Sequence, residues 1–404
     1  MARRKPLAFF SPMAVAVALA LTTGLAAASN RTVTFKEEIQ ITPKNPSSFD
    51  ISWVENSTGR YFLADRTNNA VDLIDAKTDT FVGPIGKGAF TGAVPAASCP
   101  TGGNTCSGPD GVLTDSGSHV WVGDGNSTIK VFDPTANTGL IKSIATCPPS
   151  PACGTGGKAR ADEESFDPTH QLILIANDAE GFLTFVHVDE TNPANSSVVG
   201  HFFYADNTLG VPASASGHAT AGGGLEQSVW VPQTGLFYQT VPGNADAKPP
   251  TTGFIDVFDP VSMKLVNTFS VPGCDNGPTG LALGPNQRFL GACDNGAAAV
   301  EVRNGHVHTI VSGVGGADEI WFNPGDNNFY LGIGGTAGVL DSNKLGVVDA
   351  DNDHVVTVIS GKGGHSVAAY AANNRIFEPD LHRTADPAVS VANGVAVFVS
   401  SGSR

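Results

Sequence analysis

The chain of 404 residues contains little charge, and positive charge is scarcer still. Only 15% of the residues are Asp, Glu, Lys or Arg, against about 25% in an ordinary soluble domain. The 38 acids outnumber the 23 Lys and Arg residues, so the formal net charge is −15. A nucleic-acid-binding protein needs a basic surface, and so does a protein that docks on anionic lipid. We therefore expect no nucleic-acid partner.

Several familiar sequence signals are also missing. No apolar run after residue 28 is long enough to cross a bilayer, so no membrane span is expected. No C-x-x-C, C-x-x-C-H, H-E-x-x-H or G-x-S-x-G motif occurs, so no zinc, haem or serine-hydrolase site can be assigned from a motif. Hydrophobic residues make up 41% of the chain, which is enough for a large core. The 48 glycines and the low charge favour an all-β domain with many short strands.

Residues 1–28 have the pattern of a secretion signal. Three basic residues, Arg3, Arg4 and Lys5, precede an apolar stretch, and Ala26–Ala28 form a small-residue cleavage site. An N-terminal anchor is the alternative, but the apolar stretch is short for a span. We expect residues 29–404 to form a single secreted or periplasmic domain that acts as a monomer.

The six cysteines are consistent with export. An even number of cysteines in an exported chain indicates disulfides. The simplest arrangement joins neighbours in the sequence, although six cysteines allow 15 pairings. The expected pairs are Cys99 with Cys106, Cys147 with Cys153, and Cys274 with Cys293.

A repeated unit of three strands organises the chain. A short apolar strand leads through a polar turn to a strand rich in aromatic and β-branched residues, and a third strand often ends in a hydrophobic residue and Asp. The second strands are expected at 60–65, 119–124, 171–178, 235–241, 288–294, 328–334 and 375–379. The third strands are expected at 70–76, 129–134, 184–190, 255–260, 298–304, 345–351 and 395–400.

Seven such units predict a seven-bladed β-propeller, because four-stranded blades recur every 40–50 residues or so with the excess in loops. Six blades is the alternative count, and a large β-sandwich is the alternative architecture. The last unit ends after three strands. Segment 33–41 (TVTFKEEIQ) is expected to complete it as the outer strand and so to close the ring.

Two repeats carry a family resemblance. SGPDGVLTDSGSHVWVGDGNSTIKVFDP (107–134) and GPTGLALGPNQRFLGACDNGAAAVEV (277–302) resemble the repeats of YVTN/NHL-type propellers. The resemblance covers nearly the whole mature chain, whereas no Trp-Asp pair of the WD40 type closes a blade. Related scaffolds include gluconolactonase-like and streptogramin-lyase-like enzymes as well as proteins without known chemistry, so the fold does not assign a function.

In this scaffold, the links between blades and the turns from second to third strands share one face. The other turns look short. Every long insertion falls on the shared face, and long ordered loops in compact domains are commonly functional. The insertions lie at about 83–109, 145–162, 201–225, 242–252, 335–344 and 380–394.

The residues that begin the first strands open onto the same face, around the axis. Five of the seven are carboxylates. The alignment of the repeats allows a shift of one residue, so Asp162, Glu164 or Asp318 is an alternative for its position. Crowded carboxylates repel one another, and a Ca²⁺-like cation with its 6–8 oxygen ligands would relieve the repulsion. A solvated polar channel mouth is the alternative. The seven residues are Asp50, Asp110, Glu163, Glu226, Thr279, Glu319 and His365.

Histidines beside these carboxylates are candidates for proton transfer. His365 follows two glycines at the expected mouth, and His382 and His218 lie in long insertions. In the streptogramin-lyase-like relatives, a histidine works with a metal, and the resemblance implies the same role for His365 or His382. Alternatively, each of these loop histidines is an ordinary polar side chain that faces solvent.

Other conspicuous residues are expected to be structural. Trp53, Trp230 and Trp321 in first strands and Trp121 in a second strand are expected to pack between blades. The Gly-rich segments before first strands lack a following helix that could bind phosphate. The glycines are expected only to let the backbone segments of the blades approach one another closely at the axis.

Two functions remain open. The first is a binding or scaffold protein that holds a small-molecule or protein ligand on the loop-rich acidic face, with or without a structural Ca²⁺. The second is a metal-dependent lyase or lactonase-like hydrolase, in which Asp110, Glu226 and Glu319 hold the ion and a histidine moves the proton. No complete catalytic constellation is present in the sequence, so the binding function is favoured.

Overall fold

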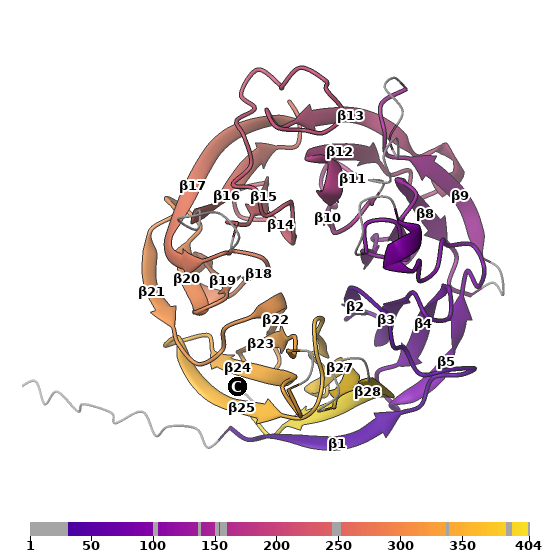
Figure 1. The fold of residues 1–404 in the computed structure, drawn as a ribbon, viewed down its shortest axis with the longest axis vertical. Coiled ribbons are helices and arrows are strands. Elements are labelled where there is room, and N and C mark those ends of the chain that lie inside the picture. The colour runs from indigo at the N-terminus through magenta and orange to yellow at the C-terminus, as the bar shows by residue number, and fades with distance from the viewer. Residues whose placement is uncertain are drawn as a thin grey trace, which may run out of the picture. The chain divides into compact units, whose positions relative to one another are not determined.

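Seven four-stranded antiparallel sheets stand around one axis as the blades of a β-propeller (Figure 1). This computed structural model describes residues 31–99, 104–135, 139–149, 153, 160–244, 252–336, 339–384 and 390–402. The chain divides into two units, Met1–Asn30 and Arg31–Arg404. The expected signal segment falls outside the described residues and stays a prediction. In the part of the chain that is described, no helix has the length and hydrophobicity to cross a membrane.

In blades 1 to 6 the order of strands in the sheet is the order along the chain, from the axis outward. Blades 1 to 3 consist of β2 (Ser52–Glu55), β3 (Arg60–Asp65), β4 (Ala70–Asp75) and β5 (Thr80–Ile85); β6 (Val112–Thr114), β7 (Val120–Asp124), β8 (Thr128–Phe132) and β9 (Leu140–Ala145); and β10 (Glu164–Asp167), β11 (Leu172–Asn177), β12 (Phe182–His187) and β13 (Ser197–Phe203). Blades 4 to 6 consist of β14 (Ser228–Val231), β15 (Leu236–Val241), β16 (Thr252–Asp259) and β17 (Lys264–Asp275); β18 (Leu281–Leu283), β19 (Arg288–Cys293), β20 (Gly296–Glu301) and β21 (Val307–Val311); and β22 (Ala317–Asn323), β23 (Asn328–Ile333), β24 (Lys344–Asp349) and β25 (His354–Ser360).

Blade 7 closes the ring because it combines strands from the beginning and the end of residues 31–404. It consists of β26 (Ala368–Tyr370), β27 (Arg375–Arg383) and β28 (Ser390–Ser400), and β1 (Val33–Ile39) adds its outer strand. β1 runs antiparallel to β28, with Val33 opposite Ser400 and Ile39 opposite Val395. The predicted closure by segment 33–41 is therefore confirmed, and so is the count of seven blades.

Short 3-10 turns are the helical elements among the described residues. They are η1 (Ala96–Ser98), η2 (Asp178–Glu180), η3 (Pro193–Asn195) and η4 (Pro285–Gln287).

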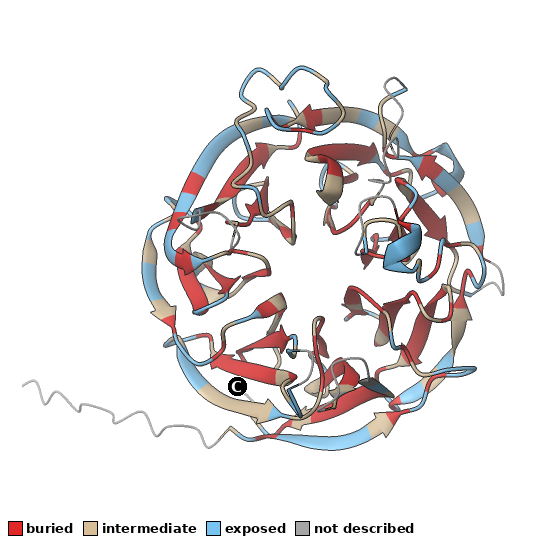
Figure 2. Ribbon diagram, viewed as in Figure 1, coloured by how far each residue is buried: buried red, intermediate tan, exposed pale blue. Residues whose placement is uncertain are grey.

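The burial of the second and third strands explains why the repeated unit can be recognised in the sequence. The second and third strands are covered on both faces by neighbouring blades, so they are nearly continuous apolar runs, as in β3 and β7. The outer strands face solvent and alternate, as in β5 (Figure 2). Each hydrophobic cluster joins two adjacent blades; one contains Trp121 and Ile129 of blade 2 with Ile173 and Ile175 of blade 3.

Antiparallel pairing places the links between blades and the second-to-third-strand turns at one end of the sheets, which we call the loop-rich face. The predicted insertions lie there, although parts of them fall outside the described residues. All three predicted disulfides are present, with Cα–Cα distances of 5.8, 5.7 and 5.1 Å, and two of them lie in these insertions.

Candidate functional site

The acidic ring around the axis is real, but its register differs from the prediction in two blades. The N–H groups of Asp50, Asp110 and Asp162 donate to the equivalent position of each second strand, at 2.9, 3.0 and 2.8 Å. Asp162, rather than Glu163, is thus the ring residue of blade 3. In blade 6 the equivalent residue is Asp318, one before Glu319, at a break in the register of β22. The seven ring residues are Asp50, Asp110, Asp162, Glu226, Thr279, Asp318 and His365.

Arg66 compensates the first part of the ring. Its side chain is only 2% exposed and contacts two carboxylates that are fully buried. The Nη2 group donates to both Asp50 and Asp110, and Nε donates to Asp110 at 3.0 Å. Nη1 donates to the carbonyl of Phe49 at 3.3 Å. Arg66 therefore ties blade 1 to blade 2 at the mouth of the channel.

Arg160 provides a second positive charge from the insertion between blades 2 and 3. Its Nη2 lies 2.6 Å from Asp162 and 3.3 Å from Asp50. Burial raises the pKa of Asp162 to about 7, although Arg160 acts in the opposite direction. Burial alone would also raise the pKa of Asp50, but Arg66 and Arg160, together with His365, bring it well below its usual value. Asp50 thus stays ionised.

His365 bridges the ring from blade 7. Its Nε2 lies 2.7 Å from Asp50 and its Nδ1 lies 2.8 Å from Asp318. Burial would lower the pKa of His365, but the two carboxylates raise it well above its usual value. With both ring nitrogens acting as donors, His365 is an imidazolium that joins blades 7, 1 and 6. In this state it has no lone pair with which to act as a general base.

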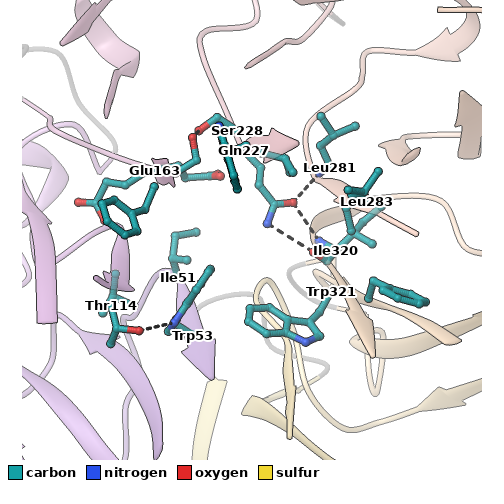
Figure 3. A pocket seen from close by; sticks show the side chains of 18 of the residues that line it. Ile51, Trp53, Thr114, Glu163, Gln227, Ser228, Leu281, Leu283, Ile320 and Trp321 are labelled. Atoms are coloured by element: carbon teal, nitrogen blue, oxygen red, sulfur yellow. Dashed lines mark hydrogen bonds between the residues drawn. The ribbon is translucent and has the colours of Figure 1, made fainter. Parts of the chain in front are cut away.

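Immediately below the ring, polar side chains cross the axis. Glu163 of blade 3 and Glu319 of blade 6 share a hydrogen bond, so one of them carries a proton. Burial, with the charge of Asp318, raises the pKa of Glu319 to about 8. Gln227 of blade 4 accepts from the N–H of Leu281 and donates to the carbonyl of Ile320 at 3.4 Å (Figure 3). Glu163 and Gln227 each directly follow a ring residue in the chain and also line the space described below.

The predicted Ca²⁺ site can be compared with these contacts. Asp50, Asp110 and Asp162 each offer one oxygen, and the three atoms lie within 4.8 Å of one another. Two guanidinium groups already contact the same carboxylates, so an ion placed there would meet positive charge at contact distance. The observed arrangement does not fit a divalent cation, and the predicted metal stays a prediction that elemental analysis can test.

The other predicted residues are not gathered into one constellation. Glu226 lies in the ring, and burial with the charge of Asp318 raises its pKa well above the usual value. His382 pairs with Asp341 at 3.0 Å. His218 pairs with Asp256 at 3.0 Å in blade 4. Among the described contacts, neither His382 nor His218 meets a ring carboxylate, so the proton-transfer role of His382 stays a prediction.

Below the polar layer lies a cavity of about 490 Å³, which we call the aromatic cavity. The inner strands of blades 1 to 6 line it (Figure 3). Its lining extends to Asp115, Ser116 and Pro168 in turns of the opposite face, so the cavity lies toward that face. The apolar side chains of the lining include Trp53, Trp230, Trp321, Phe166, Phe322 and Leu283.

The tryptophans of the first strands pack between blades, as expected, and Trp53, Trp230 and Trp321 also line the cavity. Trp53 and Trp321 stand at the cavity with ring centroids 5.1 Å apart and planes at 80°. Trp53 donates to Thr114 Oγ1 at 3.1 Å, whereas Trp230 also lines the cavity from blade 4. Trp121 is fully buried and donates to Asp115 at 3.0 Å, as predicted for a packing residue.

Sequence reasoning missed the two arginines and the cavity. Arg66 directly follows the second strand of blade 1, and Arg160 stands two residues before Asp162. Both positions lead to the loop-rich face, and basic residues are scarce enough that these two could have been paired with the ring. The aromatic cavity was harder to predict from the sequence. The alternation of apolar and polar residues in an inner strand does not show whether an apolar side chain faces the axis or a neighbouring blade.

Comparison with known proteins supports the fold alone. No protein-family model matches the chain, and no curated protein matches it. Among solved structures, the chain is similar to the WD40 β-propeller domain of Doa1, with a TM-score of 0.58 and 14% sequence identity. The match covers 91% of this chain and 96% of that one. The resemblance to YVTN/NHL-type propellers stays a prediction.

Proposed function

We propose that this chain is an exported binding protein whose ligand site is the aromatic cavity on the propeller axis. One observation carries the proposal: indole and phenyl side chains from several blades remain partly exposed inside a cavity of about 490 Å³. A concave, mostly apolar site with a few polar groups is the usual form of a small-molecule site. Export is supported by the three disulfides.

The proposal moves the ligand from the loop-rich face to the axis. At the loop-rich mouth, four ring carboxylates are paired with Arg66, Arg160 or His365, namely those of Asp50, Asp110, Asp162 and Asp318. Charged side chains that already form ion pairs gain less free energy from binding a ligand, because their contacts with one another must be broken first. In the aromatic cavity, by contrast, a bound ligand would remove apolar surface from water. This burial contributes about 25 cal/mol of binding free energy for each Å² covered.

The test is a fragment screen on the purified mature protein by ligand-observed NMR and thermal shift, with cationic, neutral and anionic fragments. Hits are then measured on Trp230→Leu, which removes one aromatic wall of the cavity. The matched control is Phe35→Leu, because Phe35 is 41% exposed on the outer strand β1. We expect hits whose affinity falls about tenfold or more in Trp230→Leu and is unchanged in Phe35→Leu. Absence of hits, or equal binding to both variants, contradicts the proposal.

A further inference from the structure

The aromatic cavity is lined by ring surface from several blades. Trp53 and Trp321 stand side by side there (Figure 3), in edge-to-face contact with ring centroids 5.1 Å apart. Because the two indoles touch, a ligand has to lie beside the pair rather than between them. The remaining aromatic side chains of the lining, which are also only partly buried, are Phe166 of β10, Trp230 of β14 and Phe322 of β22.

The lining carries no positive charge. None of the lining residues that the structure describes is Lys, Arg or His. An anionic ligand that enters the cavity would lose its hydration without gaining a positively charged partner, and moving an unpaired charge out of water is costly. The cavity therefore disfavours anions.

The acidic residues of the lining do not offer a free negative charge to a cation. Asp115 already pairs with the ring of His119, whose Nδ1 lies 3.0 Å from Asp115 Oδ2. Glu163 shares a hydrogen bond with Glu319, which requires a proton between the two carboxyl groups. Burial raises the pKa of Glu164 well above its usual value, which favours its neutral form. A cationic ligand would therefore also lose its hydration without a matching partner.

Uncharged polar groups of the lining are bonded to one another or to the backbone. Ser228 donates to Ser165 at 2.7 Å, and Trp53 donates to Thr114 at 3.1 Å. Gln227 is bonded to the backbone of β18 and β22. A sugar brings several hydroxyl groups, each of which gives up hydrogen bonds to water on binding. Protein groups that are already bonded replace those hydrogen bonds poorly, so the cavity favours a ligand with little polar surface.

The apolar walls and the bonded polar groups together define a class of ligand. Flat aromatic molecules pack favourably on the faces and edges of aromatic side chains. The volume of about 490 Å³ lies within the range of small-molecule sites. From these features, and on the basis of the proposed function, we infer that the aromatic cavity binds uncharged, weakly polar aromatic molecules in preference to organic ions and sugars.

The probes are three naphthalene derivatives of nearly the same size that differ in charge. 2-Acetylnaphthalene is uncharged, 2-naphthoate is an anion and 2-naphthylmethylammonium is a cation, and methyl glucoside serves as the sugar. Binding to the purified mature protein is measured at pH 7 by isothermal titration calorimetry and by saturation-transfer NMR. We expect the ketone to bind about tenfold more tightly than either ion, and more tightly still than the glucoside.

Two variants locate the binding. Trp230→Leu removes a ring from the wall of the cavity and should weaken the ketone about tenfold. Phe35→Leu is the matched control, because Phe35 lies on the outer strand β1, and it should leave the affinity unchanged. If Trp230→Leu does not fold, as judged by its melting curve, Phe166→Leu takes its place, since Phe166 lines the cavity from β10. The inference is overturned if either ion or the glucoside binds as tightly as the ketone, or if the ketone binds the cavity variant and the wild type equally.

Failure of the inference and failure of the proposed function are distinguishable. If charged fragments or sugars bind more tightly than the ketone and Trp230→Leu weakens them, the cavity is a binding site for another class of ligand, and only the inference fails. If no fragment of any charge binds more weakly to Trp230→Leu than to Phe35→Leu, the proposed function fails as well.

Discussion

Replacement of Arg66 by Met should remove the main charge compensation at the mouth of the propeller. In the variant, Asp50 would keep Arg160 at 3.3 Å and His365 at 2.7 Å. Asp110 would keep only Arg160 at 3.9 Å, and its second oxygen already has no hydrogen-bond partner among the described groups. Both carboxyl groups are fully buried. Breaking a buried ion pair by removing one partner costs about 3–5 kcal/mol.

This loss can be measured as a melting temperature or by denaturant titration. A domain of this size unfolds with an entropy of about 0.8 kcal/mol per kelvin, so the expected decrease in Tm is about 4–6 °C. The control is Arg303→Met, because Arg303 is exposed on the surface and its loss should change stability by less than about 0.5 kcal/mol.

The pH dependence identifies the cause. Burial raises the pKa of Asp110 well above its usual value even with Arg66 present, and the variant should raise it further. A carboxyl group whose pKa is higher in the folded state weakens the fold as the pH rises through the interval between its unfolded and folded pKa. The difference between wild type and Arg66→Met should therefore be smaller at pH 4.5 than at pH 7.

A second substitution and the control decide the matter. Arg66→Met combined with Asp110→Asn should recover more than half of the lost stability, since the unpaired acid is gone. A loss in Arg66→Met no larger than in Arg303→Met would refute the conclusion that Arg66 holds the mouth together.

Three further predictions concern other parts of the fold. The pKa of His365 is raised, so its ion pairs stabilise the protein below about pH 6.5 and are lost as the pH rises through the folded value; in denaturant titrations at pH 6 and pH 9, His365→Gln should lose stability mainly at pH 6. Replacing both Cys274 and Cys293 by Ala should cost about 3 kcal/mol, because their disulfide closes a loop with a sequence separation of 19; melting with and without reductant checks this. His218→Gln removes the hydrogen bond to buried Asp256 that raises the pKa of His218, so it should cost about 1 kcal/mol at pH 6 and less at pH 8, measured by denaturant titration.

The blades themselves were predictable. The second strand of blade 1 was expected at 60–65 and is found at Arg60–Asp65, and that of blade 6 was expected at 328–334 and is found at Asn328–Ile333. These strands are buried on both faces, so their composition follows directly from their place between two blades. The disulfides were predictable as well, since short separations along the chain bring each pair of cysteines together.

The ring was predicted as a cluster but not in its register. A strand alternates with a period of two, so a displacement of one residue exchanges the face of every side chain. In blade 3 this separates Asp162, which meets Arg160, from Glu163, which meets Glu319. No local pattern distinguishes them, because both are acids in the same short segment.

What could be read from the sequence is therefore everything that repeats: seven units, their buried strands, the closing strand and the cysteine pairs. Repetition averages over local ambiguity, and each unit meets the same environment between two neighbours. What required the folded chain is what occurs once, at the axis, where residues more than 300 positions apart come into contact, such as Asp50 and His365. There Arg66, Arg160 and His365 compensate the acids above, and Trp53 and Trp321 form the cavity below, because closure of the ring brings distant side chains within contact distance.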